Sequence, residues 1–142
     1  MLGWYTRLFD RFFDFLLQGR PSSYVRSSAS PDAPAGEPQL RVTIGELGDF
    51  YVAAGCCIQC GLPAAESHGL MAMSDEHKTC YFQKQPRTAE EVDVAIGALS
   101  VSCVGGPRYG GQNPEIIGRL YELGLNSQCD RSLSSVTKET KP

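Results

Sequence analysis

The sequence predicts a small α+β domain that spans about residues 40–126. Three observations support this prediction: short runs rich in β-branched and aromatic residues, two helix starts with capping signals, and a glycine-flanked loop that holds three of the six cysteines. A chain of 142 residues is long enough for one such domain with extensions. Around the domain we expect an amphipathic N-terminal helix at 1–18, a flexible linker at 19–39 and a disordered tail at 127–142.

The N-terminal segment has the spacing of an amphipathic helix. Aromatic and leucine side chains recur every three or four residues over 1–17, and two arginines and two aspartates fall on the opposite face. These charges rule out a membrane-spanning helix, which needs about 20 mostly apolar residues. Three alternatives stay open: a peripheral membrane contact, a contact with a partner protein, and packing on the chain's own domain. The Ser- and Pro-rich stretch that follows has no periodicity, which predicts the flexible linker.

Short strands are predicted at several points in the domain. Residues 40–44 alternate apolar and polar side chains, and residues 50–52 form a second candidate strand. Residues 70–73 and 80–83 flank a polar turn, which predicts a hairpin. Residues 108–109 follow a glycine-rich turn and are expected to form a last short strand.

Two helices are predicted from their capping residues. Thr88 followed by Glu91 forms a capping box, in which each side chain accepts a hydrogen bond from a free backbone N–H at the helix start. Apolar residues at helical spacing then continue to about Ser100. Asn113 precedes a proline and a glutamate, which is the pattern of a second helix start, and Gly124 is the expected end of that helix.

Charge and composition exclude several function classes. The net charge is −3, from 13 basic and 16 acidic residues, so the chain has no general attraction for nucleic acid. The N-terminus lacks the pattern of an export signal, and we therefore expect a cytoplasmic protein. In that compartment clustered cysteines are more often metal-binding or catalytic than disulfide-bonded. No acid–base or nucleophile arrangement is apparent, so we expect no enzymatic activity.

The cysteine loop is the strongest functional signal in the sequence. Cys57 and Cys60 are two residues apart, a spacing that lets both thiolates face one metal centre. Thiolates are soft ligands and select zinc or iron–sulfur clusters over hard cations. A redox pair of the thioredoxin type would need a long helix at the first cysteine, and Pro63 disfavours that helix.

Two segments resemble a known family. Residues 57–71, Cys-Ile-Gln-Cys-Gly-Leu-Pro-Ala-Ala-Glu-Ser-His-Gly-Leu-Met, are similar to the cluster loop of single-cluster bacterial ferredoxins. Residues 98–106, Ala-Leu-Ser-Val-Ser-Cys-Val-Gly-Gly, are similar to the region of the distant cysteine ligand in the same family. The resemblance covers about residues 41–110. It implies a ferredoxin-type α+β fold, one [4Fe–4S] or [3Fe–4S] cluster, and electron transfer to a redox partner protein.

The resemblance also implies a ligand set. Cys57, Cys60 and Cys103 fall on ligand positions of the family, whereas the third ligand of the loop falls on Pro63, which cannot bind iron. The family's loop proline falls on a histidine and its proline after the distant cysteine falls on a valine. A [3Fe–4S] cluster needs three cysteines, and a [4Fe–4S] cluster needs a fourth, for which we choose Cys80, with Cys56 as the alternative.

Two other interpretations stay open. Cys57, Cys60, His77 and Cys80 form two pairs with the spacing of a structural zinc site, which would make the protein a non-redox interaction module. That alternative leaves Cys103 without a role. The chain could also be a ferredoxin scaffold that has lost its cluster. The expected function is nevertheless that of a ferredoxin-like electron carrier with one iron–sulfur cluster.

Overall fold

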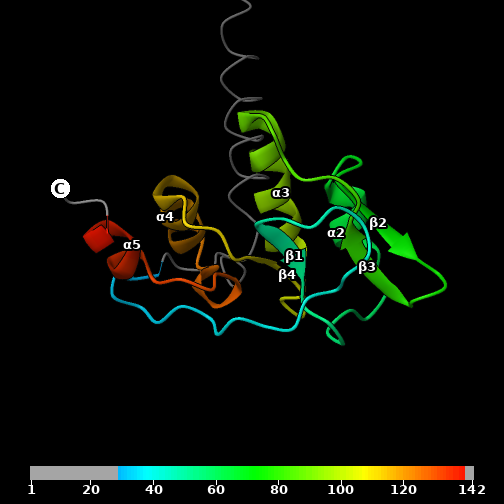
Figure 1. Cartoon of the computed structure of the whole chain (residues 1–142), viewed down its shortest axis with the longest axis horizontal. Helices are drawn as coiled ribbons and strands as arrows, with labels where there is room; N and C mark the ends of the chain where they lie inside the picture. Colours follow the sequence, from blue (N-terminus) through cyan, green and yellow to red (C-terminus); the bar gives the residue numbers. More distant parts are fainter. Residues whose placement is uncertain (1–28, 140–142) are drawn as a thin grey trace, which may run out of the picture.

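The computed structural model describes residues 29–139 and shows a small mixed α+β domain with short antiparallel strands (Figure 1). The N-terminal helix predicted at 1–18 lies outside the described residues. The elements, in chain order, are β1 (Phe50–Val52), α2 (Leu62–Glu66), β2 (Met71–Ser74), β3 (Thr79–Phe82), α3 (Ala89–Val101), β4 (Pro107–Tyr109), α4 (Pro114–Glu122), the 3-10 helix η2 (Asn126–Gln128) and α5 (Leu133–Glu139).

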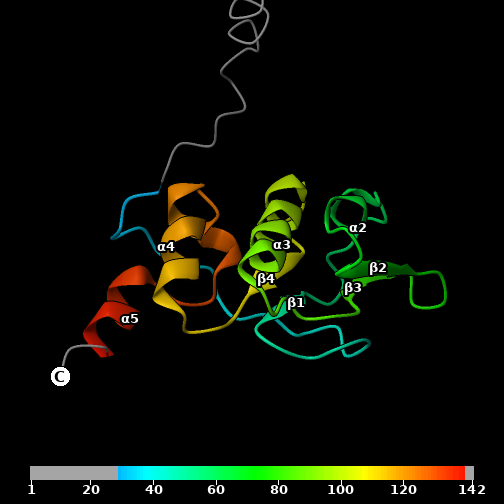
Figure 2. The ribbon, with the colours of Figure 1, turned by 90° about the horizontal axis from the view of Figure 1, so that it is seen from above.

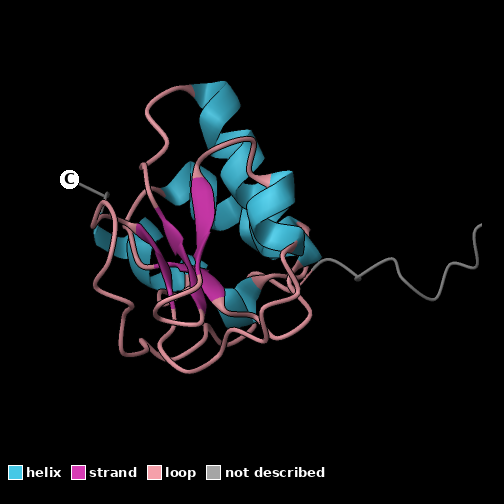
Figure 3. Ribbon diagram, turned by 90° about the vertical axis from the view of Figure 1, so that its right-hand side faces the viewer, coloured by secondary structure: helices cyan, strands magenta, loops and turns pink. Residues whose placement is uncertain are grey.

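The described strands form two antiparallel pairs (Figure 3). The predicted hairpin is confirmed: β2 pairs with β3, and Met73 lies opposite Cys80. The other pair joins β1 to β4, with Phe50 opposite Tyr109, although more than fifty residues separate these strands along the chain. This long-range pairing brings the cysteine loop, which follows β1, next to the turn that precedes β4.

Both predicted helix starts are present. The Glu91 amide donates to Thr88 Oγ1 at 3.2 Å, and the Glu91 carboxylate accepts from the Arg87 amide at 2.7 Å. The bond to the Glu91 carboxylate is therefore made by Arg87, one residue before the capping residue Thr88. At α4, the Glu115 amide donates to Asn113 Oδ1 at 2.9 Å. These local bonds satisfy N–H groups that have no partner within the helix.

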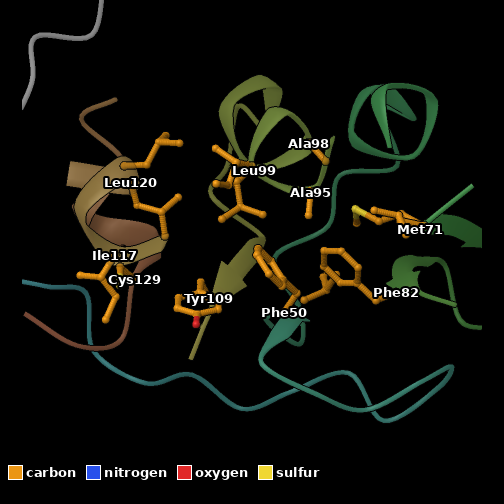
Figure 4. Close-up of a cluster of buried hydrophobic side chains, with 14 of the residues drawn as sticks. Phe50, Met71, Phe82, Ala95, Ala98, Leu99, Tyr109, Ile117, Leu120 and Cys129 are labelled. Carbon is orange, nitrogen blue, oxygen red and sulfur yellow. The ribbon is translucent and has the colours of Figure 1, made fainter. Parts of the chain in front are cut away.

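Helix α3 lies in the middle of the domain, with α4 on one side and α2 on the other (Figure 2). Its inner face packs against both strand pairs and against α4 (Figure 4). The ring of Phe50 bridges the two halves of the core, since its centroid lies 4.8 Å from that of Tyr109 and 5.9 Å from that of Phe82. The labelled core residues are Phe50, Met71, Phe82, Ala95, Ala98, Leu99, Tyr109, Ile117, Leu120 and Cys129.

The strand predicted at residues 40–44 is reduced to one isolated bridge between Arg41 and Ala53. The chain then turns away at Gly45, whose φ of 84° lies in the left-handed region. Glycine is required at this point because a Cβ would lie 2.2 Å from the carbonyl oxygen of Phe82. The alternating pattern thus predicted a strand where the backbone makes one bridge, to Ala53, and then leaves that neighbour.

Residues 29–39, which belong to the predicted linker, are bound to the C-terminal part of the domain. The Ala29 amide donates to the Tyr121 carbonyl at 2.7 Å, and the Tyr121 hydroxyl donates to the Ala33 carbonyl at 2.9 Å. The Gly36 amide donates to the Cys129 carbonyl at 2.8 Å. The linker prediction does not hold for these residues, because backbone hydrogen bonds order a segment whose side chains carry no periodic pattern.

The described part of the predicted tail, residues 127–139, is also folded, and this corrects the prediction of disorder. It contains the end of η2 and helix α5, in which Val136 is buried. Cys129 is fully buried, and its backbone forms a parallel bridge with Tyr109. The segment is polar in composition, but a few well-placed apolar side chains are enough to dock it on α4.

Candidate functional site

The cysteine loop runs from the end of β1 to the start of α2 and enters the left-handed region three times, first at Gly55 with a φ of 77°. Gln59 has a φ of 58° and Gly61 a φ of 73°. Gly61 is the N-cap of α2, and Pro63 occupies one of the first helical positions, where its missing N–H costs nothing. The position at which the ferredoxin pattern has its third loop ligand is therefore a buried residue of a short helix.

The β2–β3 hairpin brings a further thiol, that of Cys80, next to this loop. Cys80 lies in β3, and its backbone amide donates to the Sγ atom of Cys57 at 3.2 Å. The Gln59 amide donates to the same sulfur at 3.4 Å. Cys57 thus accepts two N–H···S hydrogen bonds, one from within the loop and one from the hairpin.

Cys57, Cys60 and Cys80 line one pocket. Cys80 is buried, Cys57 is half-buried and Cys60 is exposed, so the thiols extend from the core to the surface. The rest of the lining is almost entirely apolar or backbone and includes no charged side chain: Ile58, Gly61, Pro63, Met73, Ser102, Val104, Gly106 and Pro107.

The other predicted ligands are not brought into this pocket. Cys103 is exposed and does not line the pocket, although Ser102 and Val104 on either side of it do. Cys56 packs beside Gly106, where an added Cβ would lie 3.8 Å from its own Cβ. His77 is at the hairpin turn, with its Nδ1 atom 3.0 Å from Ser74 Oγ, and it is not part of the lining either.

The two hydrogen-bonded thiols differ in their ionisation. Burial raises the pKa of Cys80 to about 12, and the hydrogen bond and charge of Cys57 act in the same direction. Burial also acts to raise the pKa of Cys57, but the amides of Gln59 and Cys80 outweigh it, so that its pKa is lowered from the ordinary value. The two thiols therefore shift in opposite directions, with the pKa of Cys57 below and that of Cys80 above the ordinary value.

Met73 is a pocket residue that sequence reasoning missed. It lies opposite Cys80 in the hairpin, so its side chain is on the same face of the strand pair as the thiol. The sequence did contain the information needed to find Met73, because a hairpin that turns between residues 74 and 79 fixes which residues are opposite one another. Ile58 and Val104 were missed for a different reason: their role depends on the long-range pairing of β1 with β4.

The side chains as they stand do not surround a single ion. In the described range, 29–139, no group of three or more His, Cys, Asp or Glu side chains could hold one metal ion. A zinc ion needs its sulfur ligands at about 2.3 Å from one point. A cluster contains several iron atoms and is held by thiolates on different irons, so its ligands lie farther apart. The three thiols line one pocket, but as they stand the described residues do not form a metal-binding group.

Comparisons of the chain with protein-family models, with curated proteins and with solved structures found no match. The resemblance to single-cluster ferredoxins therefore stays a prediction from the sequence. Within residues 29–139, no helix has both the length and the apolar character needed to cross a bilayer.

Proposed function

We propose that this chain is an electron-transfer protein that carries one iron–sulfur cluster on Cys57, Cys60 and Cys80. The observation that carries the proposal is the convergence of these three thiols, from a loop and from a hairpin 23 residues away, on one pocket. Clustered thiolates in a mostly apolar setting are the donor set that such clusters use.

When bound, the cluster would supply one-electron transfer, which no side chain of the site can supply. The chain's own contribution is to set the environment of that chemistry. The N–H groups of Gln59 and Cys80 point at the sulfur of Cys57, and hydrogen bonds to cluster sulfurs shift the reduction potential. Pro63 and Met73 keep water from the inner side of the pocket.

Cys103 is our proposal for a fourth ligand. The residues on both sides of it line the pocket, and it follows the end of α3 in a turn that continues through Gly105, whose φ is 64°. Three thiols would be enough for a [3Fe–4S] cluster, and Cys103 would complete a [4Fe–4S] cluster. Cys56 packs beside Gly106 and is not itself part of the pocket lining.

The surface around the pocket suits contact with a redox partner protein. Residues 51–65 and 99–107 contain no charged side chain. Ile58 and Val104, which line the pocket, are 57% and 43% exposed. An uncharged rim with exposed apolar side chains favours a partner that approaches through apolar contacts, in contrast to the acidic outer face of α3.

The zinc alternative has less support than the cluster. It requires His77 as a ligand, but the ring of His77 interacts with Ser74 at the hairpin turn and lies outside the pocket lining. The histidine would have to leave this interaction, and the turn would have to move, before the four proposed ligands could meet.

The test is a set of single cysteine-to-serine variants of the full chain, purified without oxygen and analysed for iron, acid-labile sulfide and zinc. Cys57→Ser, Cys60→Ser and Cys80→Ser are expected to lose most of the iron and sulfide. Cys56→Ser is the matched control, since it is an adjacent, half-buried cysteine, and it is expected to keep both. Iron loss on Cys103→Ser would identify the fourth ligand. Unchanged iron in the Cys80 variant, or zinc in place of iron in the wild type, would contradict the proposal.

A further inference from the structure

Cys57 and Cys80 are placed for chemistry with each other as well as with a metal. The Cys80 amide lies 3.2 Å from the Cys57 sulfur and donates a hydrogen bond to it. Both side chains line the same pocket, and neither is part of a disulfide in the structure. The Cys57 sulfur thus lies beside the backbone of Cys80, and this proximity of the two residues is a precondition for a disulfide between them.

We propose that Cys57 and Cys80 form a reversible disulfide by exchange with a low-molecular-weight disulfide of the glutathione class. Cys57 is half-buried and can be reached from solvent, whereas Cys80 is buried. The Cys57 thiolate attacks one sulfur of the small disulfide, and a small thiolate leaves. The Cys80 sulfur then attacks the Cys57 sulfur of this mixed disulfide and loses its proton to solvent in the same step, and the second small thiolate leaves. Two protein thiols are oxidised and one small disulfide is reduced.

The geometry selects Cys80 over Cys60 as the partner of Cys57. Cys60 is exposed, and the left-handed turn at Gln59 lies between it and Cys57. The amide contact described above places the Cys57 sulfur beside the backbone of Cys80 in the hairpin.

The disulfide would regulate the site. Its formation removes two of the three thiols that the proposed cluster uses, so the cluster and the disulfide exclude each other. This regulatory consequence rests on the proposed function, whereas the formation of the disulfide does not.

The experiment uses the full chain, stripped of metal by a chelator without oxygen and then treated with oxidised glutathione. Intact mass and peptide mapping are the readouts. We expect the loss of two hydrogen atoms and a link between Cys57 and Cys80. The Cys80→Ser variant is expected to stop at a stable glutathione adduct on Cys57, and Cys57→Ser is expected to form no link to Cys80. The control Cys56→Ser should behave as the wild type.

Two results would overturn the inference: a link between Cys57 and Cys60 in the wild type, or glutathione adducts on the exposed cysteines without any link to Cys80. The two proposals fail independently. A protein that never contains iron but forms the link would contradict the electron-transfer function alone. A protein that contains iron but forms no link after stripping would contradict the disulfide alone.

Discussion

The backbone amide of Cys80 donates a hydrogen bond across 3.2 Å to the Sγ atom of Cys57, and this contact ties the cysteine loop to the β2–β3 hairpin. The loop has few other means of keeping its shape, since Ile58, Gln59 and Cys60 are all exposed. The position of the site therefore depends on a sulfur that serves as the acceptor for two amides.

The first prediction concerns the stability of the metal-free chain when this acceptor is removed. Cys57→Ala leaves the amides of Cys80 and Gln59 without their partner. We expect a loss of about 0.5–1.5 kcal/mol in the free energy of unfolding, measured by urea denaturation in the presence of a chelator. Cys56→Ala is the control, because this neighbouring cysteine is also half-buried. An equal loss for both variants would show that the sulfur of Cys57 contributes through packing alone.

The second prediction concerns Gln85, whose side chain satisfies the backbone of β1. Its Nε2 donates to the carbonyl of Phe50 at 2.8 Å, and its Oε1 accepts from the amide of Phe50 at 3.1 Å. Because Phe50 is buried, Gln85→Ala is expected to cost about 1–3 kcal/mol in the free energy of unfolding. Gln83→Ala removes an exposed side chain of the same type, bonded to the Gly69 carbonyl, and should cost less than about 1 kcal/mol. Equal costs would show that β1 does not depend on Gln85.

The third prediction compares two ion pairs. The guanidinium of Arg108 donates to Asp130 Oδ1 at 3.0 Å, with side chains that are only 9% and 6% exposed. Asp130→Asn leaves a buried, unpaired charge, and we expect it to cost about 3–5 kcal/mol in thermal or urea unfolding. Asp93→Asn breaks an exposed pair with Arg119 and should change the stability by at most about 1 kcal/mol. Similar effects of the two substitutions would contradict the assignment of Arg108 to a buried network.

The fourth prediction concerns acid. The Gln85 amide lowers the pKa of the Glu46 carboxyl, against the opposing effect of burial, and Arg87 acts in the same direction as the amide. A lowered pKa in the folded state means that the stabilisation is present above the ordinary glutamate pKa of about 4.3 and is lost as the pH falls through the folded value.

Glu46→Gln should therefore lower the urea midpoint at neutral pH and have a smaller effect as the pH falls through the folded value, because the wild-type carboxyl is then protonated. Glu76→Gln changes an exposed glutamate of the hairpin turn and serves as the control. A Glu46→Gln effect that does not change with pH would argue against a carboxylate that is stabilised in the folded state.

Local chemistry allowed much of the fold to be predicted from the sequence. Thr88 and Asn113 cap their helices through bonds to residues two or three positions away, so their signals are complete within a short window. The β2–β3 hairpin was equally accessible because its turn is short. The pairing of Phe50 with Tyr109 has no local signal, and the strand predicted at 40–44 failed because alternation does not show whether a neighbouring strand is present.

The site could be predicted only in part, because some of its residues form a local motif and others depend on long-range contacts. Cys57 and Cys60 form a local motif, and Cys80 is the residue we chose to complete the ligand set that the resemblance implies; in the structure all three line one pocket. Cys103 was assigned from the resemblance, and it lies one residue away from that lining. Cys129 is buried and its backbone pairs with Tyr109, a contact that cannot be read from the polar sequence around it.

The most direct test of the central claim is an absorption spectrum of the wild-type chain, purified without oxygen, together with counts of iron, acid-labile sulfide and zinc. The account predicts a brown protein with a broad band near roughly 400 nm and with iron and sulfide in matching amounts. A colourless protein that contains one zinc ion, or no metal after the same handling, would contradict it.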